Sequence, residues 1–199
     1  MRIRRTMAPT ALGLLLAACA GGDGPGKDRD TSNGANTDST PVDPCVLALD
    51  ATLGTGPFTY TQTTSGDTVQ IVHGEQGGWH LDFAASLVGV GRTVDVLPAV
   101  TLTDGTQIAG EQLVTTIDLA GQQGTYKPDQ CAGTFYGERA YLDDYLPQTG
   151  AYYEFICSLE GQAADVSIEV TDVATGQSIV AISEWVLQID PADQDLCAL

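Results

Sequence analysis

Basic residues are scarce in this sequence. Its 199 residues include 8 Lys and Arg against 26 Asp and Glu. Three of the basic residues lie in the first five positions, and from Cys45 onward three remain against 21 acidic residues, a net charge of −18. A field of that sign repels phosphate backbones and anionic lipid headgroups. We therefore expect no binding to nucleic acid.

Motifs that carry known catalytic chemistry are also missing. The sequence holds neither a G-x-S-x-G nor an H-E-x-x-H motif, and it has two histidines. No two cysteines have C-x-x-C spacing, which argues against a thioredoxin-like redox site and against a thiolate zinc site. We therefore expect a protein without enzymatic activity, and assign no catalytic residue and no cofactor.

Long apolar runs are missing as well, and the short run Ala11–Ala18 is too brief to span a bilayer. It follows a cluster of arginines and ends in Leu16-Ala17-Ala18-Cys19, which resembles the signal peptides of bacterial lipoproteins. The resemblance implies cleavage before Cys19 and attachment of acyl chains such as palmitate to that cysteine. Residues 1–18 are thus predicted to be a lipoprotein signal peptide. The lipid on Cys19 would contact the membrane, and Ala20 after it favours the outer membrane.

Residues 19–44 have the composition of a tether. The stretch AGGDGPGKDRDTSNGANTDSTPVDP is rich in glycine and polar residues and contains almost no apolar ones. It cannot bury enough surface to offset the entropy lost on ordering, so we expect a disordered segment. A flexible chain of this length reaches about 25–30 Å. We expect one folded domain after it, at 45–199.

Four cysteines follow Cys19: Cys45, Cys131, Cys157 and Cys197. An even number in an exported chain predicts two disulfides, with three possible connectivities. The pairing that we expect joins Cys131 to Cys157 and Cys45 to Cys197, although spacing alone does not separate the three.

Alternating apolar residues predict strands. The segment ADVSIEVTD (164–172) places Val166, Ile168 and Val170 on one face, and SIVAISEWVLQI (178–189) follows as its hairpin partner. RTVDVLPAVTL (92–102), with Pro98 marking a break or an edge, and EQLVTTIDLAG (111–121) give two further extended stretches.

Tight turns separate these stretches, and helical periodicity is rare. Glycine-containing turns are expected at SGDT (65–68), TDGTQ (103–107) and ATGQS (174–178). One short helix is expected at GERAYLDDYL (137–146). Closely spaced strands without crossover helices predict an all-β fold, an antiparallel β-sandwich.

The two histidines flank a glycine-rich turn, IVHGEQGGWH (71–80). An even-length loop would put His73 opposite His80, with Cβ atoms about 5 Å apart, near enough to share a cation. An odd-length loop would instead pair Ile71 with Phe83 and His73 with Leu81. That register gathers the apolar side chains on one face, so we favour it. It places His80 outward beside Asp82 and the two imidazole rings on opposite faces.

Tyrosines are concentrated in TFYGERAYLDDYLPQTGAYYEF (134–155), where charged residues lie between them. This composition is typical of surfaces that recognise protein or carbohydrate, and also of aromatic packing over the end of a sandwich, which we favour. The candidate recognition residues are Tyr136, Tyr141, Tyr145 and Tyr152.

The segment GDTVQIVHGEQGGWHLDFAASL (66–87), preceded by LGTG (53–56), resembles uncharacterised secreted lipoproteins of myxobacteria and related Gram-negative bacteria. The resemblance extends to LEGQAADVSIEVTD (159–172). Glu75 departs from the proline that is usual there, and the matching hairpin residues are Gly74, Gln76, Gly77, Gly78 and His80. It implies an immunoglobulin-like domain and supplies no catalytic residues.

Two functions remain open at this point. The first is a lipid-anchored protein of the cell envelope that acts as a binding or structural module for a protein or carbohydrate ligand. The alternative is a periplasmic or surface protein that binds copper or zinc through His80, with His73 and Asp82 as further ligands.

Overall fold

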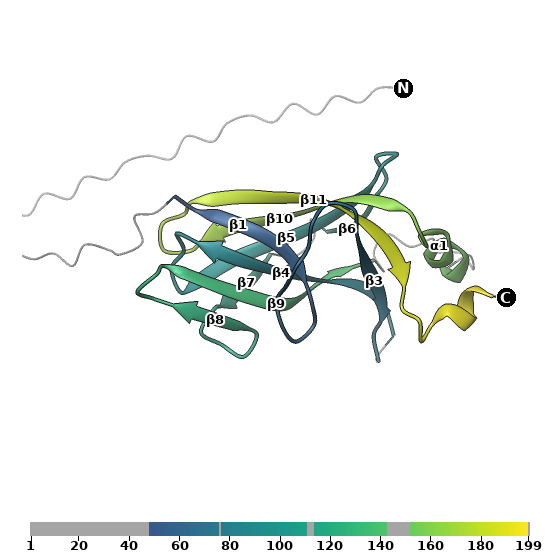
Figure 1. Cartoon of the computed structure of the whole chain (residues 1–199), viewed down its shortest axis with the longest axis horizontal. Helices are drawn as coiled ribbons and strands as arrows, with labels where there is room; N and C mark the ends of the chain where they lie inside the picture. Colours follow the sequence, from purple (N-terminus) through teal and green to yellow (C-terminus); the bar gives the residue numbers. More distant parts are fainter. Residues whose placement is uncertain (1–47, 76, 111–113, 143–151, 199) are drawn as a thin grey trace, which may run out of the picture. The chain divides into compact units, whose positions relative to one another are not determined.

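The computed structural model describes residues 48–75, 77–110, 114–142 and 152–198 (Figure 1). The predicted signal peptide, the predicted tether, Cys19, Cys45 and Tyr145 lie outside the described residues. The elements, in chain order, are β1 (Asp50–Thr55), β2 (Thr61–Gln62), β3 (Asp67–His73), β4 (Trp79–Val88), β5 (Thr93–Leu102), β6 (Gln107–Gly110), β7 (Thr115–Asp118), β8 (Gly124–Lys127), β9 (Ala132–Tyr141), α1 (Tyr152–Ser158), β10 (Ala163–Asp172), β11 (Ser178–Ile189) and a 3-10 turn η2 (Gln194–Cys197).

The strands form one continuous sheet that folds over into two layers (Figure 1). One layer contains β1, β4, β9 and β8, and the other contains β11, β10 and β5 with β6 and β7 at its edge. Strand β3 joins the layers, because it pairs with β4 on one side and with β11 on the other. The predicted all-β sandwich is confirmed.

One pairing departs from the antiparallel arrangement that we expected. Strands β3 and β11 run parallel over Asp67–Ile71 and Trp185–Ile189. Parallel neighbours cannot be joined by a tight turn and need a long connection. Here the chain between β3 and β11 makes that connection, so no local sequence pattern predicts that these two strands pair.

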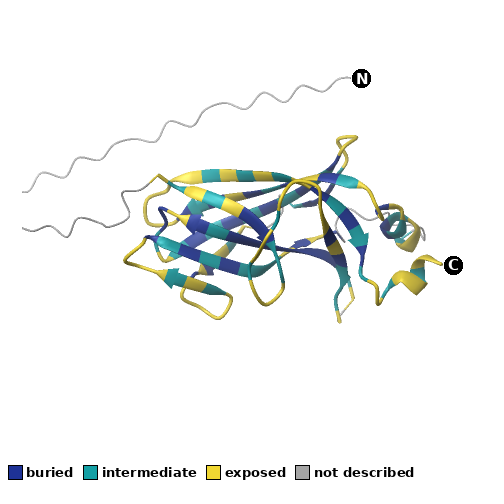
Figure 2. Ribbon diagram, in the orientation of Figure 1, coloured by how far each residue is buried: buried dark blue, intermediate teal, exposed yellow. Residues whose placement is uncertain are grey.

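The hairpin β10–β11 has the alternation that the sequence predicted. Val166, Ile168 and Val170 are fully buried, while Glu169 on the opposite face is exposed. The same striping is visible along β5, β10 and β11 in Figure 2. The three predicted turns are also confirmed, with Gly66, Gly105 and Gly176 at positive φ where each chain reversal requires it.

Strand β5 continues through Pro98, so of the two alternatives for this residue, a break or an edge, the break is wrong. On one side β5 pairs with β10 along its length, and on the other it pairs with β7 up to Val96 and with β6 from Ala99. Pro98 therefore falls at the gap between two partner strands. A residue without a backbone N–H is tolerated there because no ladder bond from a described strand is lost on that side.

The core lies between the two layers and is centred on two aromatic residues. Phe83 on β4 and Trp185 on β11 are fully buried, and their ring centroids lie 5.0 Å apart. The indole N–H of Trp185 also donates to Oγ1 of Thr63 at 3.1 Å. The pair thus joins the layers through apolar contact and satisfies the one polar group that it buries.

The short helix lies elsewhere than the sequence suggested. Residues 137–141, expected to begin a helix, belong to strand β9, and residues 143–151 lie outside the described part of the chain. The helix is α1, at Tyr152–Ser158. Within the described ranges, the structure contains no helix long and apolar enough to cross a membrane.

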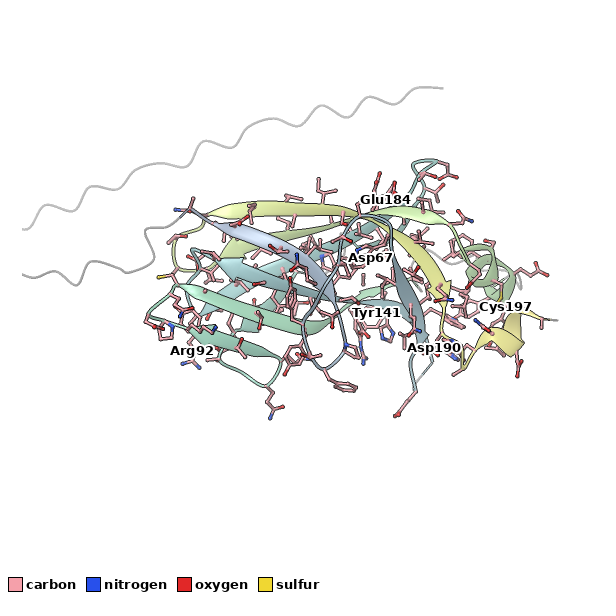
Figure 3. The ribbon with its side chains drawn as sticks, viewed as in Figure 1. Asp67, Arg92, Tyr141, Glu184, Asp190 and Cys197 are labelled. Carbon is pink, nitrogen blue, oxygen red and sulfur yellow. A yellow bond between two sulfur atoms is a disulfide. The ribbon has the colours of Figure 1, made fainter. Side chains whose placement is uncertain are left out.

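The disulfide pairing also differs from the expected one. Cys157 at the end of α1 is bonded to Cys197 in η2, with the two Cα atoms 5.4 Å apart (Figure 3). Both pairs that we preferred are therefore wrong. Cys131 is itself disulfide-bonded, and its partner lies outside the described residues. The helix and the 3-10 turn come together at the end of the domain only after the chain has completed β10 and β11, which sequence spacing does not reveal.

Candidate functional site

The length of the loop between β3 and β4 determines where the side chains of both histidines lie. It spans the five residues 74–78, and Gly77 and Gly78 adopt positive φ. The odd length that we favoured is confirmed, but the register is offset by two residues: Ile71 faces Leu81 and His73 faces Trp79. An offset of two preserves the face of every side chain. The predicted apolar face is accordingly buried, and it consists of Val69, Ile71, Leu81, Phe83 and Ala85.

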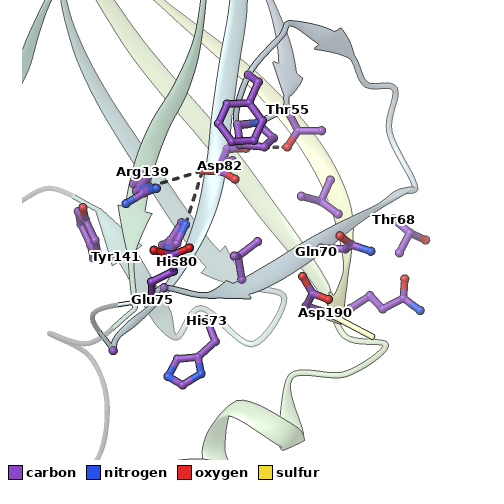
Figure 4. Close-up of a pocket in the computed structure, with 18 residues that line it drawn as sticks. Thr55, Thr68, Gln70, His73, Glu75, His80, Asp82, Arg139, Tyr141 and Asp190 are labelled. Carbon is purple, nitrogen blue, oxygen red and sulfur yellow. Dashed lines mark hydrogen bonds and ion pairs between the residues drawn. The ribbon is translucent and has the colours of Figure 1, made fainter. Parts of the chain in front are cut away.

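The two imidazole rings lie on opposite faces of the hairpin, as predicted. His73 stacks on Trp79 with ring centroids 4.5 Å apart, and its Nδ1 lies 3.6 Å from Oδ1 of Asp193. Figure 4 shows His73 pointing away from His80 and Asp82. Among the residues that the structure describes, no group of three or more His, Cys, Asp or Glu side chains is arranged to hold a metal ion. His73, His80 and Asp82 therefore do not assemble into the metal site considered above.

His80 is buried, whereas the sequence placed it outward. Its residue exposure is 3%. The Tyr141 ring lies 6.0 Å away, measured between centroids, and Gly74 packs beside the imidazole, because a Cβ there would lie 3.8 Å from the His80 ring. The outer face of β4 is covered by other parts of the chain, so alternation along the strand does not distinguish its two faces.

Asp82 is the central residue of this covered face. It is 5% exposed, and its Oδ1 lies 3.6 Å from Nε2 of His80 and 3.8 Å from Nε of Arg139 (Figure 4). Both distances exceed those of a hydrogen bond. Oδ1 accepts no hydrogen bond from the described residues. Burial raises the pKa of Asp82, and the nearby His80 and Arg139 offset part of that rise.

Two adjoining cavities open beside Asp82, with volumes of about 780 and 650 Å³. One extends over β3 and the end of β11, and the other extends along β9 towards β7. We call the two together the β4–β9 pocket. Both are lined by Pro57, Phe58, Asp82, Arg139 and Tyr141.

The loop between β1 and β2 is fixed over this pocket by a bulge in β9. The backbone N–H of Gly137 donates to the carbonyl of Gly56 at 2.9 Å. Gly137 has φ 72°, and a Cβ at this position would lie 2.8 Å from the carbonyl oxygen of Pro57. Only glycine combines that dihedral with so close an approach. The docked loop leaves the Phe58 ring 85% exposed at the rim.

Arg139 supplies the positive charge of the pocket. The described residues include three basic side chains, and Arg92 is engaged on the surface, donating to both carboxylate oxygens of Asp118 at 2.8 and 2.6 Å. This pairing lowers the pKa of Asp118 to about 2. Arg139, by contrast, is half exposed over the pocket and lies directly opposite Asp82 in the β4–β9 ladder. One of few cations in an acidic domain is thus placed at the pocket floor.

Glu138 is a second largely buried carboxyl group beside the pocket. Its Oε1 accepts a hydrogen bond from Oγ1 of Thr115 at 2.7 Å, and it lines the cavity that extends towards β7. Burial raises the pKa of Glu138, and the bond from Thr115 offsets part of that rise. Carboxyl groups with burial-shifted pKa values beside an open cavity are typical of functional sites.

Of the predicted tyrosine surface, two members border the pocket. Tyr141 is 50% exposed at the end of β9, and Tyr136 donates its hydroxyl hydrogen to the carbonyl of Gln122 at 2.8 Å. Tyr152 lies instead in α1, with its ring edge-on to Tyr153, and packs against the core. Tyr145 lies outside the described residues.

Sequence reasoning missed Phe58 and Glu138 of the pocket. The first lies in a loop whose docking depends on the β9 bulge, which only Gly137 hints at. Arg139 is one of the charged residues that lie between the tyrosines of the predicted recognition surface, and it lines both cavities.

We expect Asp82→Asn to stabilise the domain at neutral pH, by about 1 kcal/mol. The raised pKa means that the folded state binds the Asp82 proton more tightly than the unfolded state does. Stability therefore falls as pH rises from the ordinary aspartate pKa through the raised one, and stays at the lower level above it. Asparagine does not titrate, so its advantage should grow through the same interval. Thermal unfolding of both proteins from pH 3 to 8 measures this difference.

Asp172 offers a matched control for that substitution. It is equally buried, at 1% exposure, but its carboxylate accepts hydrogen bonds from the N–H of Gly91 at 2.8 Å and from the N–H and hydroxyl of Thr175 at 2.9 and 2.6 Å. Asp172→Asn should destabilise the domain by about 1–3 kcal/mol, since these bonds to a charged acceptor are weakened or lost. If both substitutions destabilise alike, Asp82 is a structural residue.

Comparison with known proteins does not assign this chain to a family. No protein-family model matches the sequence, and no curated protein matches it at a significant level. Among solved structures, the fold is similar to the CooA pilin subunit from enterotoxigenic Escherichia coli, with 12% identity, TM-score 0.34, and coverage of 71% of this chain and 99% of that one.

Two larger proteins contain a similar region. A bacterial adhesin from Mobiluncus mulieris has 8% identity, TM-score 0.34, and coverage of 68% of this chain and 48% of its own. A family 123 glycoside hydrolase from Clostridium perfringens has 12% identity and TM-score 0.34, and the match covers 72% of this chain but 28% of the hydrolase. At identities and TM-scores this low, the matches assign no activity, ligand or partner to the chain.

Proposed function

We propose that this protein is a lipid-anchored binding module of the cell envelope and that the β4–β9 pocket is its ligand site. The observation that carries the proposal is Asp82, a buried carboxylate beside open cavities whose Oδ1 accepts no hydrogen bond from the described residues. Leaving such an acceptor unsatisfied costs about 1–3 kcal/mol, so folding alone does not account for it. A ligand that donates a hydrogen bond to the Asp82 carboxylate would offset that cost.

The proposed role is binding, without catalysis. The nearby His80 and Arg139 lower the pKa of Asp82 against the effect of burial and so favour its ionised, accepting form. The pocket rim offers aromatic and amide side chains, the surroundings that pockets use to orient a ligand. Thermal unfolding in the presence of fractions of bacterial envelope tests the role: a fraction that raises the melting temperature of the wild type, but not of Phe58→Ala, supports it. A pocket that responds to no fraction contradicts it.

The anchor part of the proposal rests on Leu16-Ala17-Ala18-Cys19. Several acyl chains on one cysteine provide stable attachment where one chain is marginal. We propose the outer membrane as the location, from Ala20 after the lipidated cysteine. Residues 19–44 would then act as the tether between the membrane and the sandwich.

We predict that Cys19→Ser moves the protein out of the membrane fraction or leaves it as an uncleaved precursor. Serine offers no thiol for the lipid, so the step that precedes cleavage cannot occur. Fractionation followed by mass spectrometry of the N-terminal peptide measures both outcomes, and Cys157→Ser serves as a control that removes a cysteine from the folded domain. Normal processing and membrane retention of the Cys19→Ser protein would contradict the lipoprotein assignment.

A further inference from the structure

We infer that the β4–β9 pocket binds a neutral saccharide; the inference rests on the proposed binding function and names the ligand class of that site. Three features of the pocket carry it: the balance of charge around Asp82, the hydrogen-bonding groups of the lining, and the exposed aromatic rings at the rim. Each selects against other classes of ligand.

The charges at the pocket floor are already paired with one another. The Arg139 guanidinium lies within 3.8 Å of Asp82 and His80 lies within 3.6 Å. An anionic ligand would meet Asp82 and Glu138 in a domain whose net charge is strongly negative. A cationic ligand would compete with Arg139 for the same carboxylate. The paired floor thus suits a neutral molecule that donates to the Asp82 carboxylate and accepts from the Arg139 guanidinium.

Amide and hydroxyl side chains line both cavities, alongside the acidic side chains of Glu75 and Asp190 in the first. One cavity is lined by Thr55, Thr68, Gln70 and Gln188, and the other by Thr115, Gln122 and Gln123. Amides and hydroxyls each donate and accept, and they match sugar hydroxyl groups, which also do both. An acyl chain carries no such groups and could not use a lining of this kind.

Aromatic rings complete the match at the rim. Phe58 is 85% exposed and Tyr141 50% exposed, and both border the two cavities. The docked β1–β2 loop keeps Phe58 in water although the ring could be buried at a gain of about 1.5–3 kcal/mol. A pyranose presents a flat face of C–H groups beside its hydroxyls. Such a face can cover an aromatic ring while the hydroxyls reach the polar floor.

Calorimetric titration of the mature lipoprotein with neutral oligosaccharides tests the inference. The protein is held in a detergent without a sugar headgroup, and the probes are maltotetraose, cellotetraose and N,N′-diacetylchitobiose. We expect at least one of them to bind, and Asp82→Asn and Phe58→Ala each to weaken that binding by about tenfold or more. Asp82→Asn is expected to keep or raise the melting temperature, so lost binding cannot be ascribed to unfolding.

Ile182→Ala is the matched control for Phe58→Ala. Ile182 is 72% exposed on β11 and lines neither cavity of the pocket, so its loss should leave binding unchanged. Failure of all three oligosaccharides, or binding that survives both pocket substitutions, overturns the saccharide inference. If spermidine or an envelope lipid instead binds in a manner that depends on Phe58, the ligand class is wrong and the proposed binding function stands. The absence of any pocket-dependent ligand overturns both.

Discussion

Replacing Cys157 and Cys197 together by serine is expected to lower the free energy of unfolding by about 4 kcal/mol. The bond closes a loop with a sequence separation of 40 residues that contains the whole of β10 and β11. Without it, the unfolded chain regains the freedom that loop closure removes. The loss is a large fraction of the roughly 5–15 kcal/mol that holds an ordinary domain together.

Urea denaturation at equilibrium measures this effect and shows where it arises. An unfolded chain freed from the cross-link exposes more surface, so the slope of unfolding free energy against urea should rise in the double-serine variant. None of the residues in η2 is buried, so a bond that merely held down a fraying end would change neither the slope nor the global transition. An unchanged transition would contradict the prediction. The single variant Cys131→Ser separates this bond from the second one.

Peptide mapping without reduction supplies the matching covalent evidence. The map should contain one cross-linked pair of peptides that joins Cys157 to Cys197. Because Cys131 is also bonded, and Cys19 is the proposed lipid site, the second pair should join Cys131 to Cys45. A map that returns Cys131 with Cys157 would restore the pairing expected from the sequence.

The sequence predicted best those features that depend on neighbours along the chain. The hairpin of β10 and β11 needs only alternation and a glycine turn, and both strands lie within a residue of the expected bounds. The buried face of β3 and β4 was found in the same way. Its register was off by two, because the apolar pattern repeats every two residues and does not distinguish registers that differ by that period.

Features that depend on distant segments were not predictable. The parallel pairing of β3 with β11 and the meeting of α1 with η2 both require the finished fold. The pocket could not be predicted for the same reason. His80 and Asp82 occupy polar positions of an alternating strand, and such positions ordinarily face water. The loop docked on Gly137, Gly74, and the side chains of Arg139 and Tyr141 cover that face.

The position of Trp185 in the core depends both on its neighbours along the chain and on distant segments. Alternation along β11 places it inward, but nothing local reveals that Phe83 lies opposite at 5.0 Å or that Thr63 accepts its N–H. Thr63 precedes the turn that leads into β3, and Trp185 begins the segment of β11 that pairs with β3. The residue therefore lies where the two layers are joined, and removing its side chain should destabilise the packing of both layers.

Trp185→Ala is expected to lower the free energy of unfolding by about 3–5 kcal/mol, because it empties the space beside Phe83 in a core that cannot fully collapse. Thr63→Val is the matched control: it removes the hydrogen bond, keeps the ring contact, and should cost about 1–3 kcal/mol through the unpaired indole N–H. Denaturation followed by circular dichroism compares the two without relying on tryptophan emission. A loss from Trp185→Ala no larger than that from Thr63→Val would mean that the indole holds the layers by its polar edge, and that the contact with Phe83 contributes little.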